Sequence, residues 1–148
     1  MIKNLVNIQN ELKAPKSNFN SFGKYRYRSA EDILTAVKPL LAKYNCTMTI
    51  TDEVVFIGGR FYIKATATIT DEEGNTESVS AYAREDESKK GMDGSQITGT
   101  ASSYSRKYCL NGMFLIDDTK DADTDEFHNQ TQDRSKFTKT YLKQHGNE

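Results

Sequence analysis

Three short segments interleave basic and aromatic side chains, and they are the parts of the sequence best suited to chemistry. They are Lys24-Tyr25-Arg26-Tyr27-Arg28, Arg60-Phe61-Tyr62-Ile63-Lys64 and Tyr104-Ser105-Arg106-Lys107-Tyr108. Basic side chains neutralise phosphates and aromatic rings stack on unpaired bases, so this composition is typical of a groove that binds single-stranded nucleic acid. Each segment alone is explained better by core tyrosines and solvated cations. The hypothesis therefore depends on the three segments acting together.

A short acidic run is the second feature that could carry chemistry. Residues 117–126 hold six acidic side chains and one lysine, whereas residues 1–116 hold 15 basic and 13 acidic side chains, so the run offsets a mildly basic body and the net charge is −1. Three aspartates match the first ligands of a calcium loop, but the glycine and the final glutamate of that loop are missing. The positions concerned are Asp121, Asp123, Asp125, Glu126 and Gln132. A solvated segment explains the run better than a metal site, and competition with DNA for a basic surface is a third interpretation.

The sequence lacks the residue sets of the common catalytic and metal-binding motifs. Both histidines, His128 and His145, lie in the polar C-terminal segment, so no nucleophile has a histidine base on a rigid element. The sequence contains no GxxxxGK[ST], CxxC or HExxH pattern, which argues against a phosphate-binding loop and a zinc site. We therefore expect a protein that is not an enzyme and that needs no metal or other cofactor.

Cysteine content and hydropathy indicate the compartment. Cys46 and Cys109 are too few and too far apart for a disulfide scaffold, so we expect free thiols in a reducing compartment. No stretch approaches the roughly 18 apolar residues of a membrane span. The N-terminus shows no apolar run followed by a cleavage site. These features predict a soluble intracellular protein with no membrane partner.

The elements that must position the basic segments follow from the spacing of apolar side chains. Residues 2–13 have helical spacing, and a second helix begins after Ser29, the expected N-cap, with Asp32 as its capping-box partner. Between these helices we expect a polar loop over residues 17–23, followed by an extended segment that alternates basic and aromatic side chains.

Three strands and a helix follow. Alternating residues predict strands over residues 47–51, 61–70 and 78–84. The short turns between them favour an antiparallel meander with one buried face. Small residues begin the next helix, over about residues 96–112, so we expect it to lie tightly across the sheet, with Tyr104 in the core. Glycine inside a helix is unfavourable, so Gly99 indicates either close packing or a functional approach at that position. The predicted class is α+β, with a β-β-β-α core and flanking N-terminal helices. Residues 1–126 are the expected domain, and residues 127–148 are the expected flexible polar tail.

Two motifs in these elements resemble a known family. Residues 99–112 read GTASSYSRKYCLNG, and residues 22–33 read FGKYRYRSAEDI. Both resemble the signature of the ERF (essential recombination function) family, which comprises single-strand annealing proteins, mostly of phages and prophages. The resemblance extends over roughly residues 2–125 and includes the acidic ending that begins at Asp117.

The resemblance implies ATP-independent binding of single-stranded DNA and annealing of complementary strands in homologous recombination. It also implies assembly into rings or helical filaments in the cytoplasm of a bacterial host cell. The expected partners are single-stranded DNA, further copies of the chain, and a single-strand-binding protein or a phage exonuclease. The family core is similar to the β-β-β-α order that the residue spacing predicts independently.

The DNA-binding hypothesis requires cations that hold the phosphates of one extended strand in a single channel. Pairing of the exposed bases then supplies about 1.4 kcal/mol per stacked step, so annealing needs no nucleotide hydrolysis. The resemblance places the helix with Arg106 and Lys107 beside the DNA. The complete set of expected DNA-binding residues is Arg106, Lys107, Lys24, Arg26, Arg28, Arg60, Lys64, Arg84, Lys89, Lys90, Tyr25 and Tyr27.

Two other interpretations stay open. The first is a metal-dependent nuclease that uses the acidic run over residues 117–126, although a nuclease needs carboxylates held on separate rigid elements. The second is an interaction module whose exposed helix stripe binds a replication or recombination protein. Cleavage of labelled DNA in the presence of magnesium distinguishes the nuclease from an annealing protein.

Overall fold

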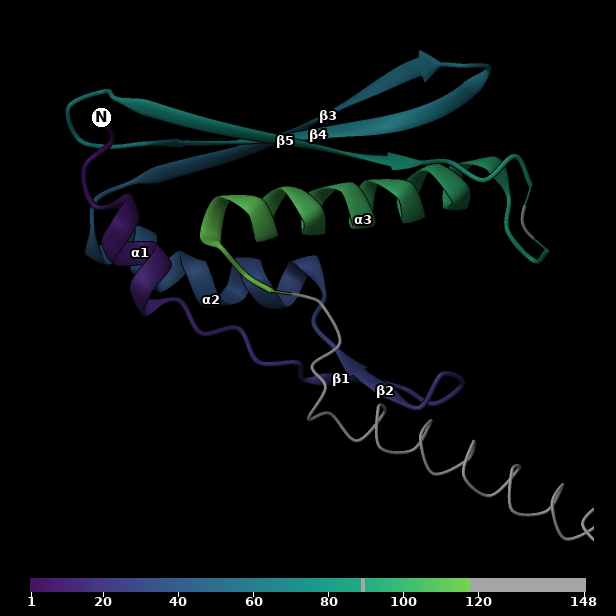
Figure 1. Cartoon of the computed structure of the whole chain (residues 1–148), viewed down its shortest axis with the longest axis horizontal. Helices are drawn as coiled ribbons and strands as arrows, with labels where there is room; N and C mark the ends of the chain where they lie inside the picture. Colours follow the sequence, from purple (N-terminus) through teal and green to yellow (C-terminus); the bar gives the residue numbers. More distant parts are fainter. Residues whose placement is uncertain (89, 118–148) are drawn as a thin grey trace, which may run out of the picture.

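The computed structural model describes residues 1–88 and 90–117, and a three-stranded antiparallel sheet lies along one side of it (Figure 1). Its strands β3 (Thr47–Ile57), β4 (Arg60–Thr70) and β5 (Thr76–Arg84) lie side by side in chain order. Gly58 and Gly59 both have positive φ, 59° and 79°, and form the two-residue turn between β3 and β4. On the central strand β4, every second side chain is buried, so the sheet has one covered and one open face.

The helix α3 (Gly94–Phe114) crosses the covered face of the sheet (Figure 1). The thiol of Cys109 donates a hydrogen bond to the carbonyl of Val79 at 2.8 Å, and its sulfur accepts one from the backbone N–H of Ala67 at 3.2 Å. A Cβ at Gly112 would lie 3.3 Å from a methyl group of Val79, so the helix packs closely on β5 at this glycine. These contacts hold α3 against both β4 and β5.

Two N-terminal helices cover the side of α3 that faces away from the sheet (Figure 1). They are α1 (Leu5–Glu11) and α2 (Ala30–Lys43). The amide of Gln9 donates a hydrogen bond to the carbonyl of Met113 at 2.8 Å, which ties α1 to the end of α3. The core residues that these helices share with α3 include Ile8, Ile33, Val37, Leu110, Met113 and Phe114. The helix α3 is therefore packed on two sides, which fixes its rotation about its own axis.

A short hairpin precedes α2. Its strands β1 (Asn18–Asn20) and β2 (Tyr25–Tyr27) pair antiparallel. The side chain of Asn20 accepts hydrogen bonds from the backbone N–H groups of Phe22 and Gly23, at 3.0 and 2.9 Å, and so closes the turn. The prediction of a loop over residues 17–23 is therefore wrong at residues 18–20, because this side-chain hydrogen bonding organises strands too short for alternation to reveal.

The predicted α+β class, the meander and the order of the elements are confirmed. Ser29 caps α2 as expected, in a capping box with Asp32, and Asp93 caps α3 in a second capping box with Gln96. Both cysteines are buried free thiols, as expected. Close packing at Gly99 is wrong, since a Cβ there would meet no atom within 4 Å, and a functional approach at this position stays a prediction. The core position expected for Tyr104 is also wrong, because its side chain is 50% exposed. No helix within residues 1–88 and 90–117 combines the length and apolar character needed to cross a membrane. The expected domain boundary at residue 126 lies outside the described residues.

Candidate nucleic-acid interface

The β1–β2 hairpin and α3 enclose a hollow of about 320 Å³, which we call the hairpin groove. Its lining consists of Asn20, Tyr25, Tyr27, Arg28, Ser29, Ala30, Ser103, Tyr104 and Lys107. Two of these side chains are cations, three are tyrosines and none is acidic. The fold therefore brings one cation from the N-terminal hairpin together with one from the third helix. This composition suits a segment of single-stranded nucleic acid, whose phosphates need cations and whose bases stack on aromatic rings.

Arg28 is held in place by backbone groups from two other segments. Its Nε donates to the carbonyl of Ala14 at 2.8 Å, and its Nη1 donates to the carbonyl of Asp117 at 2.9 Å. On the same hairpin, the rings of Tyr25 and Tyr27 have centroids 6.1 Å apart. The groove thus has one cation whose position is set before any ligand arrives, which reduces the conformational entropy lost on binding.

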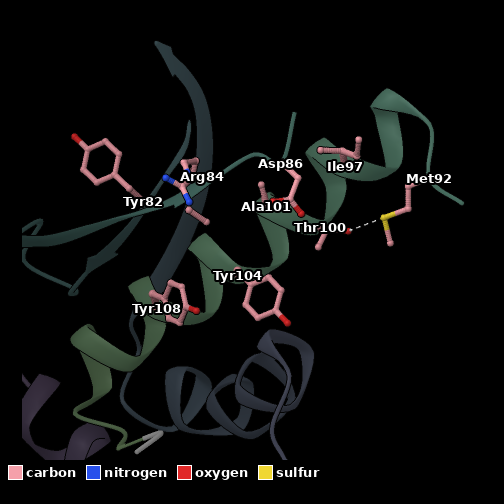
Figure 2. Close-up of a pocket in the computed structure, with 10 residues that line it drawn as sticks. Tyr82, Arg84, Asp86, Met92, Ile97, Thr100, Ala101, Tyr104 and Tyr108 are labelled. Carbon is pink, nitrogen blue, oxygen red and sulfur yellow. Dashed lines mark hydrogen bonds between the residues drawn. The ribbon is translucent and has the colours of Figure 1, made fainter. Parts of the chain in front are cut away.

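A second hollow, of about 360 Å³, lies between β5 and α3, and we call it the tyrosine groove (Figure 2). Its lining consists of Tyr82, Ala83, Arg84, Asp86, Met92, Ile97, Thr100, Ala101, Tyr104 and Tyr108. Figure 2 shows Tyr104 and Tyr108 projecting from α3, and their ring centroids are 6.1 Å apart. Because Tyr104 lines both grooves, the two hollows adjoin at this residue.

Two other predicted cations lie on the open face of the sheet, away from the hairpin groove. The alternation of β4 places Lys64 and Arg60 opposite its buried side chains. The Nζ of Lys64 lies 5.8 Å from the centroid of the Tyr82 ring. Arg60 donates to the carbonyl of Glu85 at 3.1 Å and forms an ion pair with Glu87 at 3.5 Å. These cations belong to a different surface from Lys107.

Arg106 forms an ion pair with Asp52 across the interface between α3 and the sheet. Its Nε lies 3.1 and 3.3 Å from the two carboxylate oxygens, and its Nη2 lies 3.2 Å from the second of them. The hydroxyl of Ser102 donates to the same carboxylate at 2.5 Å. Partial burial raises the pKa of Asp52, but the hydrogen bonds from Arg106 and Ser102 outweigh it and hold the pKa below its ordinary value. The carboxylate is therefore charged at neutral pH and links β3 to α3.

The remaining predicted site residues are spread over the surface. Lys24 and Arg26 are exposed on the hairpin, Lys90 is exposed before α3, and Lys89 lies outside the described residues. The structure thus brings together Tyr25, Tyr27, Arg28 and Lys107, whereas Arg84 lines only the β5 rim of the adjoining groove, at the strand edge where its side chain leaves toward the open face. It does not gather the predicted cations into a single channel within one copy of the chain.

Sequence reasoning missed the tyrosine groove. Tyr104 and Tyr108 are spaced by four residues and share a helical stripe with Ile97 and Ala101, and this spacing led to the expectation that Tyr104 lies in the core. Only one signal pointed the other way: the polar phenol groups favour a position where one end of the ring meets water. Asp52 was also missed, because a single aspartate within a predicted strand shows no partner at the sequence level.

The acidic run over residues 117–126 lies almost entirely outside the described residues. Only its first residue, Asp117, belongs to the described chain, and residues 118–126 lie outside it. Within the described ranges, no group of three or more histidine, cysteine or acidic side chains is arranged to hold a metal ion. The nuclease interpretation therefore stays a prediction about residues whose positions are not described.

Comparison with known proteins connects the chain with recombination. The ERF superfamily profile matches residues 1–148. The essential recombination function protein of Salmonella phage P22 is 60% identical over 136 residues, which are 92% of this chain and 64% of that relative. The chain thus spans slightly less than two thirds of the length of this relative. No solved structure matches the chain.

Proposed function

The chain belongs to the ERF superfamily, and on this premise we propose that it binds single-stranded DNA in the hairpin groove and anneals complementary strands during recombination. One observation carries the proposal. Arg28 and Lys107, from distant parts of the sequence, line the same hollow with three tyrosines and no acidic side chain. That combination neutralises phosphates and offers rings to bases without repelling the strand.

The geometry suggests how annealing proceeds without a nucleotide cofactor. Arg28 and Lys107 hold phosphates of one strand, and the tyrosines limit the positions of its bases. A complementary strand then pairs with the bases that face solvent, and each stacked step contributes about 1.4 kcal/mol. Several copies along one strand multiply weak contacts, which is why we also propose that the protein acts as an oligomer. A single-strand-binding protein or a phage exonuclease as a further partner remains a prediction from the family resemblance.

A matched pair of lysine variants tests the placement of the DNA. Lys107→Ala removes a cation from the hairpin groove, and Lys64→Ala removes one from the open sheet face. If Lys107 contacts a phosphate, its loss removes about 1.5 kcal/mol, or roughly tenfold in affinity. The slope of log affinity against log salt also becomes shallower by about 0.7. Fluorescence anisotropy of a labelled oligo(dT) measures both quantities, and circular dichroism checks that each variant is folded.

Annealing is followed with two complementary oligonucleotides that carry a donor and an acceptor dye. We expect Lys107→Ala to slow annealing and Lys64→Ala to leave it close to the unmodified rate. If Lys64→Ala weakens binding as much as Lys107→Ala or more, the DNA lies on the open sheet face and the hairpin-groove proposal is wrong. A salt-independent affinity would contradict a phosphate-led interface altogether.

A further inference from the structure

Within the part of the chain that the structure describes, both outer edges of the sheet are unpaired. The strand order β3-β4-β5 leaves one edge of β3 and one edge of β5 without a neighbouring strand among the described residues. An unpaired edge presents a row of backbone N–H and C=O groups that a strand of another chain can complete. We infer that β5 of one copy pairs in parallel with β3 of the next copy. This inference rests on the oligomeric part of the proposed function.

The outward-facing groups of β5 can be identified from one hydrogen bond. The backbone N–H of Glu85 donates to the carbonyl of Phe61 at 2.8 Å, which marks this pair as hydrogen-bonded. In an antiparallel ladder, hydrogen-bonded and non-bonded pairs alternate. The residues of β5 that direct their N–H and C=O groups away from β4 are therefore Thr76, Ser78, Ser80, Tyr82 and Arg84. Their side chains lie on the open face of the sheet.

The outward-facing groups of β3 follow from its turn. A two-residue turn at Gly58 and Gly59 makes its flanking residues, Ile57 and Arg60, a hydrogen-bonded pair. Alternation from this pair assigns the outward backbone groups of β3 to Met48, Ile50, Asp52, Val54 and Phe56. The side chains of these residues point to the face that α3 covers.

These two patterns fit parallel pairing between copies in the same orientation. In a parallel ladder, a residue forms hydrogen bonds to the two residues on either side of its opposite neighbour. The residues that bond across the join must therefore carry their side chains on one face of the sheet in one strand and on the opposite face in the other strand. The strands β3 and β5 meet this condition, and both run antiparallel to β4 and hence in the same direction. A head-to-tail repeat would therefore join the sheets with every α3 on one side. Such a repeat closes into a ring or continues as a filament.

Apolar residues of β3 would fill the tyrosine groove in this arrangement. Val54 and Phe56 are 59% and 62% exposed, and the ring of Phe56 packs on Phe61 with centroids 4.8 Å apart. They lie on the face of the sheet that also carries α3, at the end that extends toward the β3–β4 turn. In the next copy, that face continues into the groove beside β5, where Tyr104 and Tyr108 are half-exposed. The join would thus bury apolar surface on both copies.

Charge is complementary across the same edges. The charged side chains of β3 are both acidic, Asp52 and Glu53, whereas β5 carries Glu77 near its start and ends with Arg84, so the complementary charge is at the Arg84 end. Val55 and Arg84 both lie opposite Tyr62, so they occupy one row across the sheet. An unstaggered join would place Glu53 diagonally beside Arg84 of the neighbouring copy. Since Asp52 is already paired with Arg106, Glu53 is the acidic residue available for this contact.

Proline at an outward-facing position tests the pairing. Ser80→Pro removes an N–H that the β4 ladder does not use and blocks the outer edge of β5. Ser80→Ala is the matched control, because both changes remove the 2.8 Å hydroxyl contact with Thr66 but only proline blocks the edge. The mass of each protein is measured without DNA by light scattering after size exclusion. We expect the unmodified chain and Ser80→Ala to assemble, and Ser80→Pro to associate at least tenfold more weakly.

Two further variants keep the test decisive if Ser80→Pro does not fold. Phe56→Ser changes an exposed side chain and should also weaken assembly. Glu53→Arg and Arg84→Glu should each weaken it, and the two together should restore it. An unmodified chain that is monomeric at high micromolar concentration, or assembly that survives Phe56→Ser and Ser80→Pro, overturns the inference. A monomer that still binds oligo(dT) refutes the edge pairing alone, whereas an edge-paired oligomer that does not bind it refutes only the DNA site.

Discussion

Replacing Arg106 with alanine should lower the stability of the fold and leave the affinity for single-stranded DNA nearly unchanged. Arg106 lies next to Lys107 in the sequence, but its guanidinium is paired with Asp52 and lines neither groove. The family resemblance, in contrast, predicts that Arg106 contacts DNA. If Arg106 has a structural role, replacing its partner Asp52 destabilises the fold and leaves DNA affinity unchanged. If Arg106 contacts DNA, replacing Asp52 frees its guanidinium and strengthens DNA binding. Variants of Asp52 therefore distinguish the two roles.

The size of the effect follows from the geometry of the ion pair. Nε and Nη2 of Arg106 both approach the carboxylate, at 3.1 to 3.3 Å. The side chains are 39% and 28% exposed, so water screens much of the attraction. We therefore expect a net contribution of about 1 kcal/mol, the upper end for exposed pairs. For a chain of this length, that corresponds to a decrease in Tm of about 4 °C.

A double-mutant cycle with Asp52→Asn measures this contribution. Urea unfolding is followed by circular dichroism for the unmodified chain, each single variant and the double variant. We expect each single change to destabilise the fold and the coupling energy to be about 0.5–1 kcal/mol. In the anisotropy assay, neither change should alter DNA affinity more than twofold. If Arg106→Ala weakens DNA binding as much as Lys107→Ala while Asp52→Asn strengthens it, Arg106 is a DNA contact and the structural role assigned to it is wrong.

Three further predictions concern the thiols, the carboxylates and the acidic run. Burial raises the pKa of the thiols of Cys46 and Cys109. Neither thiol should therefore react with an aromatic disulfide reagent at neutral pH until urea unfolds the chain. Rapid labelling of the native protein would contradict their burial. The backbone N–H and the hydroxyl of Ser29 hold the pKa of Asp32 below its ordinary value, and Arg106 and Ser102 do the same for Asp52. Both carboxylates therefore stabilise the fold above the unfolded pKa of about 3.9. This stabilisation is lost as the pH falls through the pKa values of the folded state. Thermal melts from pH 6 down to about pH 2.5 test this, and Asp52→Asn should flatten the decline. Finally, labelled single-stranded DNA incubated with magnesium or manganese should stay intact, because a nuclease needs carboxylates held on separate rigid elements and the candidate aspartates all come from the single run over residues 117–126. Cleavage that is lost on replacing these aspartates would favour the nuclease.

The parts of the fold that the sequence predicts are those determined by near neighbours. Alternation along β4, the two glycines before it and the capping boxes at Ser29 and Asp93 all act within a few residues. Each of these signals agrees with the others, so the meander and the helix after it emerge in the correct order. The α+β class needs no knowledge of how distant elements dock.

Features that depend on docking were predicted poorly. The spacing of Tyr104 and Tyr108 is that of a buried stripe, yet α3 turns these rings toward the outer side of β5. Glycines within a helix indicate that the helix packs closely on a neighbouring element at some point. Whether Gly99 or Gly112 makes this contact depends on which turn of α3 meets Val79 of β5. The β1–β2 hairpin rests on a side chain of Asn20 that closes its own turn, and strands of three residues contain too few positions to show a period.

The separation of Arg106 from Lys107 shows why a cluster of cations in the sequence is not a cluster on the surface. Successive residues of a helix point about 100° apart, so one of two adjacent cations can face a sheet while the other faces a groove. The docking of α3 through Cys109 decides which is which, and it turns Arg106 toward Asp52 on β3 and Lys107 toward the hairpin. If copies join through β3 and β5, the tyrosine groove is filled by protein and Arg84 faces Glu53 of the neighbour. If the hairpin groove is the DNA site, as we propose, a strand would then pass from the hairpin of one copy to the hairpin of the next. The single channel that one copy lacks would in that case be built by the assembly.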